Sequence, residues 1–540
     1  MTIDSLPPLD VSFQDDPRVV REAKTEDYSL HVVPKTWRSG RGSLAMAWMG
    51  LISAMFWLVV AGTVSLAVGT VDTLIGMLLA VAFYGATGFV VTAYTARSGT
   101  TVALFSRTLL GFLGAALPTL IFAATVIYFA VFEASVVAVA FENYFGGLSF
   151  ELWSLVVVAY QVPLVFGGVR VWLDRFNGAL LPLYVLGLVA AVVWAIVEHG
   201  YDGAWFTFEP VPAPPISGPG WWFACTAYLG VMVLVMTVWD YGRFGREEDA
   251  RFNGIFTFGP VFYLGCLVVN GLIGIFLAST IPTEGPLSEI SVVLGIVSLM
   301  GFAGVAFIVV SQTRINTVNF YLASTNLESF FARALRLQLP RWVWAVVAGA
   351  IVYLIMLTDV FSFILDALRY QGVFVVSWVA IAMVHIAWER SHGRTPESAE
   401  FRPGRVPLIN PGGMAALLVS AAVGIYLLAG AGAFGATWST PITALVAAAV
   451  YLVSLTFARR GWFVIDRPHD PRSEVDDVWT GRVRCHVCDK SYIAVEMDRD
   501  PTAGHQAICG ACATKQPGFH RAASRERTAV HEGEVAKAEA

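Results

Sequence analysis

The segment that decides the fold is ISVVLGIVSLMGFAGVAFIVV at residues 290–310, which continues directly into SQTRINTVNFYLAS at residues 311–324. The first part is long enough to cross a bilayer, because a helix rises about 1.5 Å per residue and the hydrocarbon core is about 30 Å thick. The second part stays compatible with a helix but carries Gln312, Thr313, Arg314, Asn316 and Asn319. Polar side chains in a span normally face a cavity or a partner. The stretch therefore predicts a spanning helix whose end carries a polar wall.

Apolar runs of this kind recur through most of the 540 residues. The chain is 56% hydrophobic and only 14% charged, and its mean hydropathy is +0.65. Soluble domains are closer to a quarter charged. We expect an all-α polytopic membrane protein with twelve transmembrane helices. The predicted spans are 44–68, 73–96, 114–142, 151–169, 177–198, 221–239, 255–279, 288–322, 342–359, 361–388, 413–433 and 439–458.

The distribution of charge predicts the orientation of the spans. Lysine and arginine gather in the N-terminal tail, in the even-numbered connections and after the last span. The odd-numbered connections TVD, ENYFGGLSFE, EHGYDGAWFTFEP and TIPTEGPLSE hold acids and no lysine or arginine. Because basic residues near span ends stay in the cytoplasm, we expect a multi-pass protein of the cell (inner or plasma) membrane with both termini cytoplasmic.

Composition divides the chain into five segments. We expect a cytoplasmic N-terminal tail at 1–40, a twelve-span domain at 41–460, a charged linker at 461–482, a small ribbon at 483–515 and a polar, disordered tail at 516–540. The linker assignment follows from its proline and its charges.

Four of the six cysteines form a motif with a specific spacing. CHVC and CGAC place Cys485, Cys488, Cys509 and Cys512 in two C-x2-C pairs separated by twenty residues. This spacing is typical of a tetrahedral Zn²⁺ site, in which each pair turns two thiolates toward one ion. The segment is too short to fold on a hydrophobic core alone. We expect a structural zinc ribbon, with a redox dithiol as the alternative. His486 and His505 are expected bystanders, and Cys225 and Cys266 are expected packing residues.

Glu133 is a carboxylate near the middle of the third span. Phe129 precedes it by one helical turn on the same face. An aromatic ring and an acceptor on one stripe suit a flat heterocycle, which can stack and donate N–H hydrogen bonds. The alternative is a structural Glu133 that is protonated or paired with a neighbouring helix.

The eighth span places Asn316 and Asn319 three residues apart, on one face. An amide offers a donor and an acceptor together, as the edge of a nucleobase requires, although hydrogen bonding between helices is an equally ordinary role. Arg314 points elsewhere. It can reach the membrane surface, pair with an acid such as Glu133, or remain as a fixed cation in the core.

The first and sixth spans contain residues that suit an interrupted helix. Span one mixes Ser53 and Ala54 with Trp57, and span six has Gly230 near its centre. Interrupted helices can offer free backbone groups to a substrate and an ion. The spans contain no nucleotide-binding loop, catalytic triad or metal motif, so we expect neither an enzyme nor an ATP-driven pump.

The sequence resembles the nucleobase–cation symporter-1 family of purine, cytosine, allantoin and hydantoin permeases over residues 35–460. The resemblance rests on four segments and their order among twelve spans. These are SAMFW at 53–57, SRTLLGFLGAALPTLIFAATVIYFAVFE at 106–133, DYGRF at 240–244 and QTRINTVNFYLASTNLESFF at 312–331.

The resemblance implies a fold of two inverted five-helix repeats plus two helices, a LeuT-like arrangement with spans one and six broken in mid-membrane. It implies a substrate site between spans one, three, six and eight. The implied substrate-binding residues are Trp57, Phe129, Glu133, Thr226, Tyr228, Asn316 and Asn319, with Cys225 beside them on span six. The implied ion-coupling residues are Ser53, Ala54, Thr313 and Arg314.

Two positions depart from the family pattern. Glu133 stands where family members have a glutamine, which favours a cationic or N–H-rich substrate, or a protonatable coupling group. Sodium-coupled members place two hydroxyl residues five and six positions before the span-eight asparagine. Counted from Asn319, these positions are Arg314 and Thr313; counted from Asn316, they are Ser311 and Val310. We therefore hypothesise that Arg314 replaces the sodium ion.

These observations predict a secondary active transporter, a permease or symporter that imports a small nitrogenous ring compound such as a nucleobase, hydantoin or allantoin by alternating access. Transport is expected to be proton-coupled or uncoupled. One alternative is a membrane sensor whose zinc ribbon recruits a cytoplasmic protein partner. Another is a transporter of amines or amino acids with a related fold. No nucleic-acid partner is expected.

Overall fold

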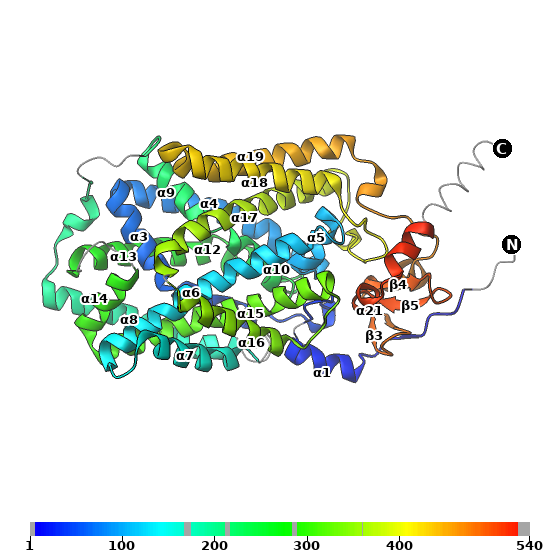
Figure 1. Cartoon of the computed structure of the whole chain (residues 1–540), viewed down its shortest axis with the longest axis horizontal. Coiled ribbons are helices and arrows are strands. Elements are labelled where there is room, and N and C mark those ends of the chain that lie inside the picture. The colour runs from blue at the N-terminus through cyan, green and yellow to red at the C-terminus, as the bar shows by residue number, and fades with distance from the viewer. Residues whose placement is uncertain are drawn as a thin grey trace.

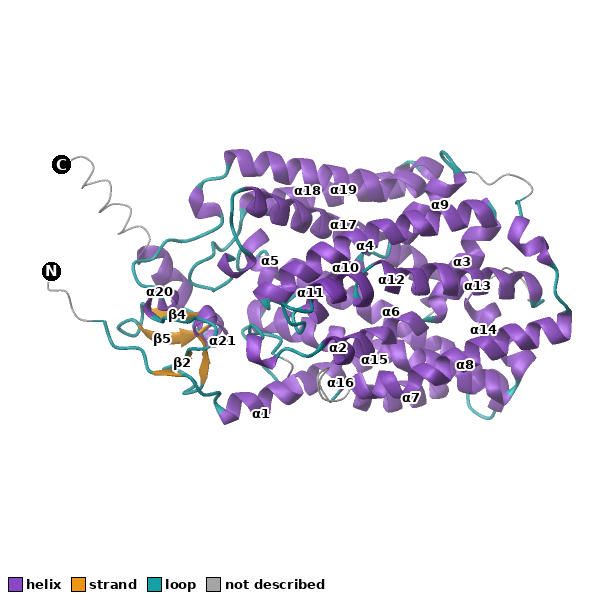
Figure 2. Ribbon diagram, turned by 180° about the vertical axis from the view of Figure 1, so that it is seen from behind, coloured by secondary structure: helices purple, strands orange, loops and turns teal. Residues whose placement is uncertain are grey.

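The chain folds into a helical bundle and a small domain that contains strands. The structure, a computed structural model, describes residues 6–26, 28–166, 174–210, 216–282, 289–358 and 360–526. The small domain sits at one end of the bundle (Figure 1). Figure 2 shows the same arrangement from behind, with the strands confined to this end. We call residues 482–515 the ribbon domain and the adjoining end of the bundle the ribbon end.

The bundle is built from helices that are apolar because they cross a membrane. Its elements are α2 (Arg41–Trp48), α3 (Met55–Val68), α4 (Thr70–Ser98), α5 (Val102–Leu110), α6 (Ala116–Phe145), α7 (Phe150–Gln161), α8 (Asp174–His199), α9 (Gly220–Leu229), α10 (Val233–Gly242), α11 (Ala250–Phe252), α12 (Pro260–Tyr263), α13 (Asn270–Thr280), α14 (Glu289–Met300), α15 (Phe302–Ala334), α16 (Arg341–Met356), α17 (Val360–Ser391), α18 (Pro411–Gly430) and α19 (Gly432–Phe457). Among the described residues, seven helices are long and apolar enough to span a membrane, or nine when each of two bent pairs counts as one. The chain is a multi-pass membrane protein, and the number twelve remains a prediction.

The two bent pairs are spans one and six. Helices α2 and α3 meet at 46°, and α9 and α10 meet at 42°. A tight turn over Met49–Ser53 joins the first pair, and Ala54 continues it with an extended backbone. The second pair breaks at Gly230, where α9 ends. The expectation that spans one and six are interrupted is therefore confirmed.

The predicted span 288–322 is wrong as a single helix. Gly301 has φ of +55°, a left-handed conformation that favours glycine and ends the helical path. Helix α14 therefore stops at Met300, and α15 begins afresh at Phe302. Because α15 continues to Ala334, the polar stretch 311–324 lies inside this helix and not at its end.

Helix α15 is the centre of the bundle. It packs along α6 and also contacts α8, α14 and α16. Every residue from 311 to 329 is buried, so the polar stretch faces protein and not lipid. The last two helices, α18 and α19, lie together against α17 on one side of the bundle (Figure 1).

The ribbon domain is completed by the N-terminal segment. Its elements are β2 (Arg482–Arg484), β3 (Ser491–Ile493), β4 (Met497–Asp500), β5 (Gln506–Cys509) and α21 (Gly510–Lys515), flanked by α1 (Pro17–Glu26) and α20 (Pro471–Glu474). Strand β1 (Val11–Ser12) pairs antiparallel with β2, which pairs with β3, while β4 and β5 form a separate pair. The N-terminal tail thus contributes one strand, β1, to this domain.

The tail that follows α21 is helical where the sequence predicts disorder. Residues 519–526 form a helix, and residues 527–540 lie outside the described part of the chain. Phe519 explains the difference, because its ring is fully buried and Arg467 lies over it at 5.8 Å from the ring centre.

Candidate functional site

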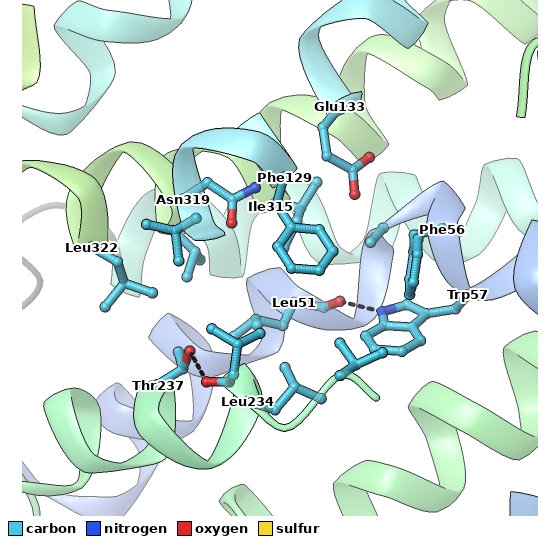
Figure 3. A pocket seen from close by; sticks show the side chains of 15 residues that line it. Leu51, Phe56, Trp57, Phe129, Glu133, Leu234, Thr237, Ile315, Asn319 and Leu322 are labelled. Carbon is cyan, nitrogen blue, oxygen red and sulfur yellow. Dashed lines mark hydrogen bonds between the residues drawn. The ribbon is translucent and has the colours of Figure 1, made fainter. Parts of the chain in front are cut away.

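A cavity lies where the two breaks face α6 and α15. Figure 3 shows that its lining comes from elements far apart in the sequence. The lining residues are Leu51, Ala54, Phe56 and Trp57 of span one, Val126, Phe129 and Glu133 of α6, Val231, Val233, Leu234 and Thr237 of span six, and Ile315, Val318, Asn319 and Leu322 of α15.

Phe129 and Glu133 line the cavity one helical turn apart on α6, as their spacing predicts. In Figure 3 the phenyl ring of Phe129 and the carboxylate of Glu133 both point inward. Phe56 meets Phe129 edge to face, with ring centres 5.7 Å apart. Trp57 also lines the cavity, and its indole N–H donates to the Leu51 carbonyl at 2.9 Å. One acidic group therefore lies within an aromatic wall.

Gln312 is a functional candidate that the sequence reasoning missed. Its side-chain amide donates a hydrogen bond to the Glu133 carboxylate. Its side-chain carbonyl accepts from the backbone N–H of Met55 at 3.3 Å, at the start of α3. Gln312 therefore joins the acid of α6 to the break in span one. Its spacing of seven residues from Asn319 places both on one face of α15, and this periodicity was the available signal.

Asn319 and Asn316 have different positions in the site. Asn319 lines the cavity, and its amide donates to the side-chain carbonyl of Asn316 at 3.0 Å. The Asn316 amide donates in turn to Gln161 on α7 at 2.9 Å and to the Ala130 carbonyl at 3.2 Å. Asn316 thus makes the helix-to-helix bonds that were the alternative reading of its sequence, and it holds Asn319 in place.

Arg314 lies fully buried at the break in span one. It donates from Nη2 to the Met49 carbonyl at 2.7 Å, and its guanidinium lies 5.6 Å from the centre of the Tyr184 ring. Of the three positions left open by the sequence, this is the fixed cation in the core. The Asn270 side-chain amide donates to the backbone carbonyl of Ile52 in the same break, at 2.6 Å.

The other predicted ion-coupling residues separate into two groups. Ser53 and Ala54 lie at the break, where the Ser53 hydroxyl is 2.8 Å from the Gly50 carbonyl and 3.1 Å from the Ser311 carbonyl. The Ser311 hydroxyl donates back to the Ser53 carbonyl. The Thr313 hydroxyl is instead paired with the Tyr160 hydroxyl at 2.8 Å.

The predicted span-six residues do not line the cavity. Thr226 bonds within its own helix, to the Phe223 carbonyl at 3.0 Å, and the Tyr228 carbonyl accepts from the Tyr84 hydroxyl at 2.8 Å. Cys225 is likewise absent from the cavity wall. The break at Gly230 turns the chain, so the residues that face α15 belong to the break and to α10, among them Leu234 and Thr237.

The four ribbon cysteines converge on one point. Their sulfur atoms all lie within 4.8 Å of one another. The backbone N–H of Cys509 donates to Cys485 Sγ at 3.4 Å, and that of Cys512 to Cys509 Sγ at 3.5 Å. Hydrogen bonds from the neighbouring thiols lower the pKa of Cys485 well below its ordinary value, which favours a thiolate. Four such sulfur atoms can serve as ligands of one metal ion. His486 is not part of this group; its Nε2 lies 2.9 Å from the Asp500 carboxylate.

Comparison with solved structures identifies the architecture of the bundle. The chain superposes on Mhp1, a nucleobase-cation-symport-1 family transporter, in a closed conformation with bromovinylhydantoin bound, with a TM-score of 0.61 at 15% identity over 83% of this chain and 96% of that one. The bundle has the fold of this transporter. The inward-facing conformation of Mhp1 matches equally, with a TM-score of 0.61 at 14% identity over 79% of this chain and 93% of that one.

A second transporter shows the same fold. A Na⁺-coupled sialic acid symporter in a substrate-bound outward-open state matches with a TM-score of 0.56 at 12% identity, over 81% of this chain and 92% of that one. No protein-family profile and no curated protein matches the sequence. The bundle therefore has a fold used by secondary transporters of different substrates.

Proposed function

We propose that the protein is a secondary transporter that imports a small nitrogenous ring compound, such as a nucleobase, hydantoin or allantoin, by alternating access. The observation that carries this proposal is the cavity that joins Phe129, Glu133 and Asn319 at the two helix breaks. Transporters of this architecture bind substrate at discontinuous helices near the bilayer midplane.

The chemistry of the wall favours a flat, polar-edged ligand. A ring stacks on Phe129, its N–H groups donate to the Glu133 carboxylate, and the Asn319 amide reads a mixed donor and acceptor edge.

The coupling ion is proposed to be a proton, or none. Arg314, one of the implied ion-coupling residues, supports this, because its permanent charge already binds the Met49 carbonyl at the break in span one. Glu133 can carry a coupling proton. The Gln312 amide that donates to it links its charge state to the break in span one.

The ribbon domain is proposed to hold a structural Zn²⁺. Four thiols within 4.8 Å of one another, with backbone N–H groups donating to two of the sulfurs, fit a tetrahedral zinc site. We further propose that the ribbon end is cytoplasmic and that the protein resides in the cell membrane, because the basic connections lie on that side of the predicted topology. A cytoplasmic protein partner at the ribbon stays a prediction.

The deciding experiment measures binding and uptake of labelled nucleobases, hydantoins and amines by purified protein in proteoliposomes, with and without a Na⁺ gradient. We expect one ring compound to bind. Phe129→Ala should weaken its affinity roughly two- to tenfold, the loss of about 0.5–1.5 kcal/mol of aromatic contact. Phe141→Ala is the matched control on the same helix, where the ring packs on Trp153.

Three outcomes would contradict the proposal or redirect it. Equal affinities for the two phenylalanine variants would place the ligand elsewhere. Binding of an amine in preference to every ring compound, lost in Glu133→Gln, would support the amine transporter instead. A strict Na⁺ requirement would reject the role proposed for Arg314.

A further inference from the structure

On the side of the cavity that faces the ribbon end, α10 and α15 contact each other. One turn beyond Thr237, the ring of Tyr241 meets that of Tyr321 edge on, with centres 5.7 Å apart. Nearby, the Asn326 amide donates to the Asp240 carboxylate at 3.4 Å. Any opening of the cavity toward the ribbon end has to separate these two helices.

Two adjacent residues of the N-terminal segment bridge the same helices. The Tyr28 carbonyl accepts from Arg243 Nη1, just past the end of α10, at 3.0 Å. The Ser29 hydroxyl donates to the Glu328 carboxylate on α15. Tyr28 holds φ of +57°, which is disfavoured for a residue other than glycine, so its surroundings fix this turn. The segment therefore ties the helix that carries Thr237 to the helix that carries Asn319.

The ribbon domain also contacts this segment, through Tyr492 and Glu496. The His31 ring stacks on the Tyr492 ring, with centres 4.4 Å apart and planes at 6°. The Glu496 carboxylate bonds His31 Nδ1 at 2.8 Å and accepts from the Val32 backbone N–H at 2.9 Å. The Glu496 side chain is only 3% exposed, so these bonds are shielded from water.

These contacts depend on the fold of the ribbon domain. Its strands are three or four residues long, and Tyr492 and Glu496 lie in the chain between the two cysteine pairs. The four thiols fit a metal ion, and a bound ion would add to the stability of so small a domain, because metal binding and folding are coupled. Loss of such an ion would loosen the loop that presents Tyr492 and Glu496.

We propose that the ribbon domain is a metal-dependent latch. While folded, it holds residues Tyr28–Val32 across the ends of α10 and α15 and keeps the cavity closed at the ribbon end; when the metal leaves, the segment is released and these helices can separate. The proposal rests on the transport function proposed above, because it assigns the ribbon end one of the two gates of alternating access.

Hydrogen–deuterium exchange of the purified full-length protein tests the latch without attaching a probe to any residue. Peptides that cover residues 240–245 and 321–328 report on the closed gate, and peptides from α13 report on the opposite end. We expect removal of the metal with a high-affinity zinc chelator to speed exchange at the gate about tenfold, as for the loss of bonds to a charged group. Exchange in α13 should not change.

Two variants separate the latch from the stability of the ribbon domain. Glu496→Ala removes the carboxylate that binds His31 and Val32, and Ser29→Ala removes only the hydroxyl on Glu328. Both should speed gate exchange while elemental analysis still finds the metal. Asp489→Asn is the control, because this carboxylate is 59% exposed and pairs with Arg484 and Arg18 rather than with residues Tyr28–Val32.

The latch is overturned if the ribbon domain becomes exchangeable after chelation while residues 240–245 and 321–328 stay as protected as before. It is also overturned if Asp489→Asn speeds gate exchange as much as Glu496→Ala. Failure of the transport proposal looks different, since no ring compound or amine would then bind, whatever the exchange at the gate.

Discussion

At the scale of single residues, Arg314 has the clearest consequence. Its side chain is fully buried and donates to the Met49 carbonyl. A guanidinium keeps its charge at any physiological pH. A second cation cannot share the same carbonyl without strong repulsion in a medium of low dielectric constant. For the transport function proposed above, the residue therefore bears directly on which ion is coupled.

We expect wild-type uptake to be the same in Na⁺ and K⁺ gradients. Arg314→Ser removes the fixed charge and leaves the Met49 carbonyl without this donor, so uptake should fall and Na⁺ should now stimulate it. Arg336→Ser is the matched control, because Arg336 is exposed just past the end of α15. The measurement is initial uptake in proteoliposomes under each gradient. Unchanged, Na⁺-independent uptake by Arg314→Ser would contradict the assignment.

At the scale of elements, the break in span one is stabilised by side chains of α15. Gln312 accepts from the first free N–H of α3 and donates to Glu133 on α6. The Ser311 hydroxyl donates to the Ser53 carbonyl within the same break. A break exposes backbone groups that have no partner within their own helix, and buried groups of that kind need one. The polar stretch of α15 supplies these partners.

Gln312→Leu should destabilise the protein by about 1–3 kcal/mol, because it leaves the buried Met55 N–H without its acceptor. Thr317→Val is the matched control on the same helix, since the Thr317 hydroxyl bonds only within α15, to the Arg314 carbonyl at 2.7 Å. Thermal unfolding followed by tryptophan fluorescence compares the two. Equal melting temperatures would show that Gln312 does not support the break.

The connection between α17 and α18 anchors the ribbon domain through charge. Arg402 binds Glu400 at 2.6 and 2.9 Å and Asp470 at 2.6 and 2.9 Å. Burial alone would raise the pKa of Glu400, but the adjacent charge of Arg402 overrides it and lowers the pKa to about 2. The folded pKa is thus below the unfolded value of about 4.3. The pair stabilises the fold fully above that pH, and the stabilisation is lost as the pH falls through the folded pKa.

Wild type should therefore be more stable than Glu400→Gln at neutral pH, and the difference should shrink between about pH 4 and pH 2. Melting temperatures of the two proteins across this range provide the measurement. Because any loss of metal at low pH affects both proteins, their difference isolates the carboxylate. A difference that stays constant down to pH 2 would contradict the lowered pKa of Glu400.

At the scale of the whole molecule, the ribbon domain links the N-terminal segment and residues 519–526 to the bundle. Strand β1 from the N-terminal segment completes its sheet, and the Gln338 amide just after α15 donates to the Ala511 carbonyl at 3.0 Å. The His520 ring lies 3.2 Å from the Val406 carbonyl. A change in the ribbon domain can therefore reach the helical bundle through several connections.

Purified protein should contain about one zinc ion per chain, as expected for a single four-cysteine site. Cys485→Ser should lose it, and Cys266→Ser, which alters a buried thiol within the bundle, should keep it. Elemental analysis of the purified variants decides between these outcomes. A metal-free wild type whose four ribbon cysteines form disulfides would favour the redox dithiol.

The sequence by itself determined the features that depend on near neighbours in the chain. Hydropathy and length determine the apolar helices, a spacing of four places Phe129 and Glu133 on one wall, and the C-x2-C pairs bring four sulfurs together. Each follows from the helical period or from a local turn, which act over a few residues.

Only the tertiary structure decided which distant groups meet. It split the predicted span 288–322 at Gly301, moved the span-six contribution from Thr226 and Tyr228 to α10, and brought Gln312 to Glu133 across 179 positions of sequence. It also placed the N-terminal segment between the ribbon domain and the ends of α10 and α15. The physical reason is that side-chain partners across helices depend on the rotation and bend of each helix, which packing sets and no local pattern records.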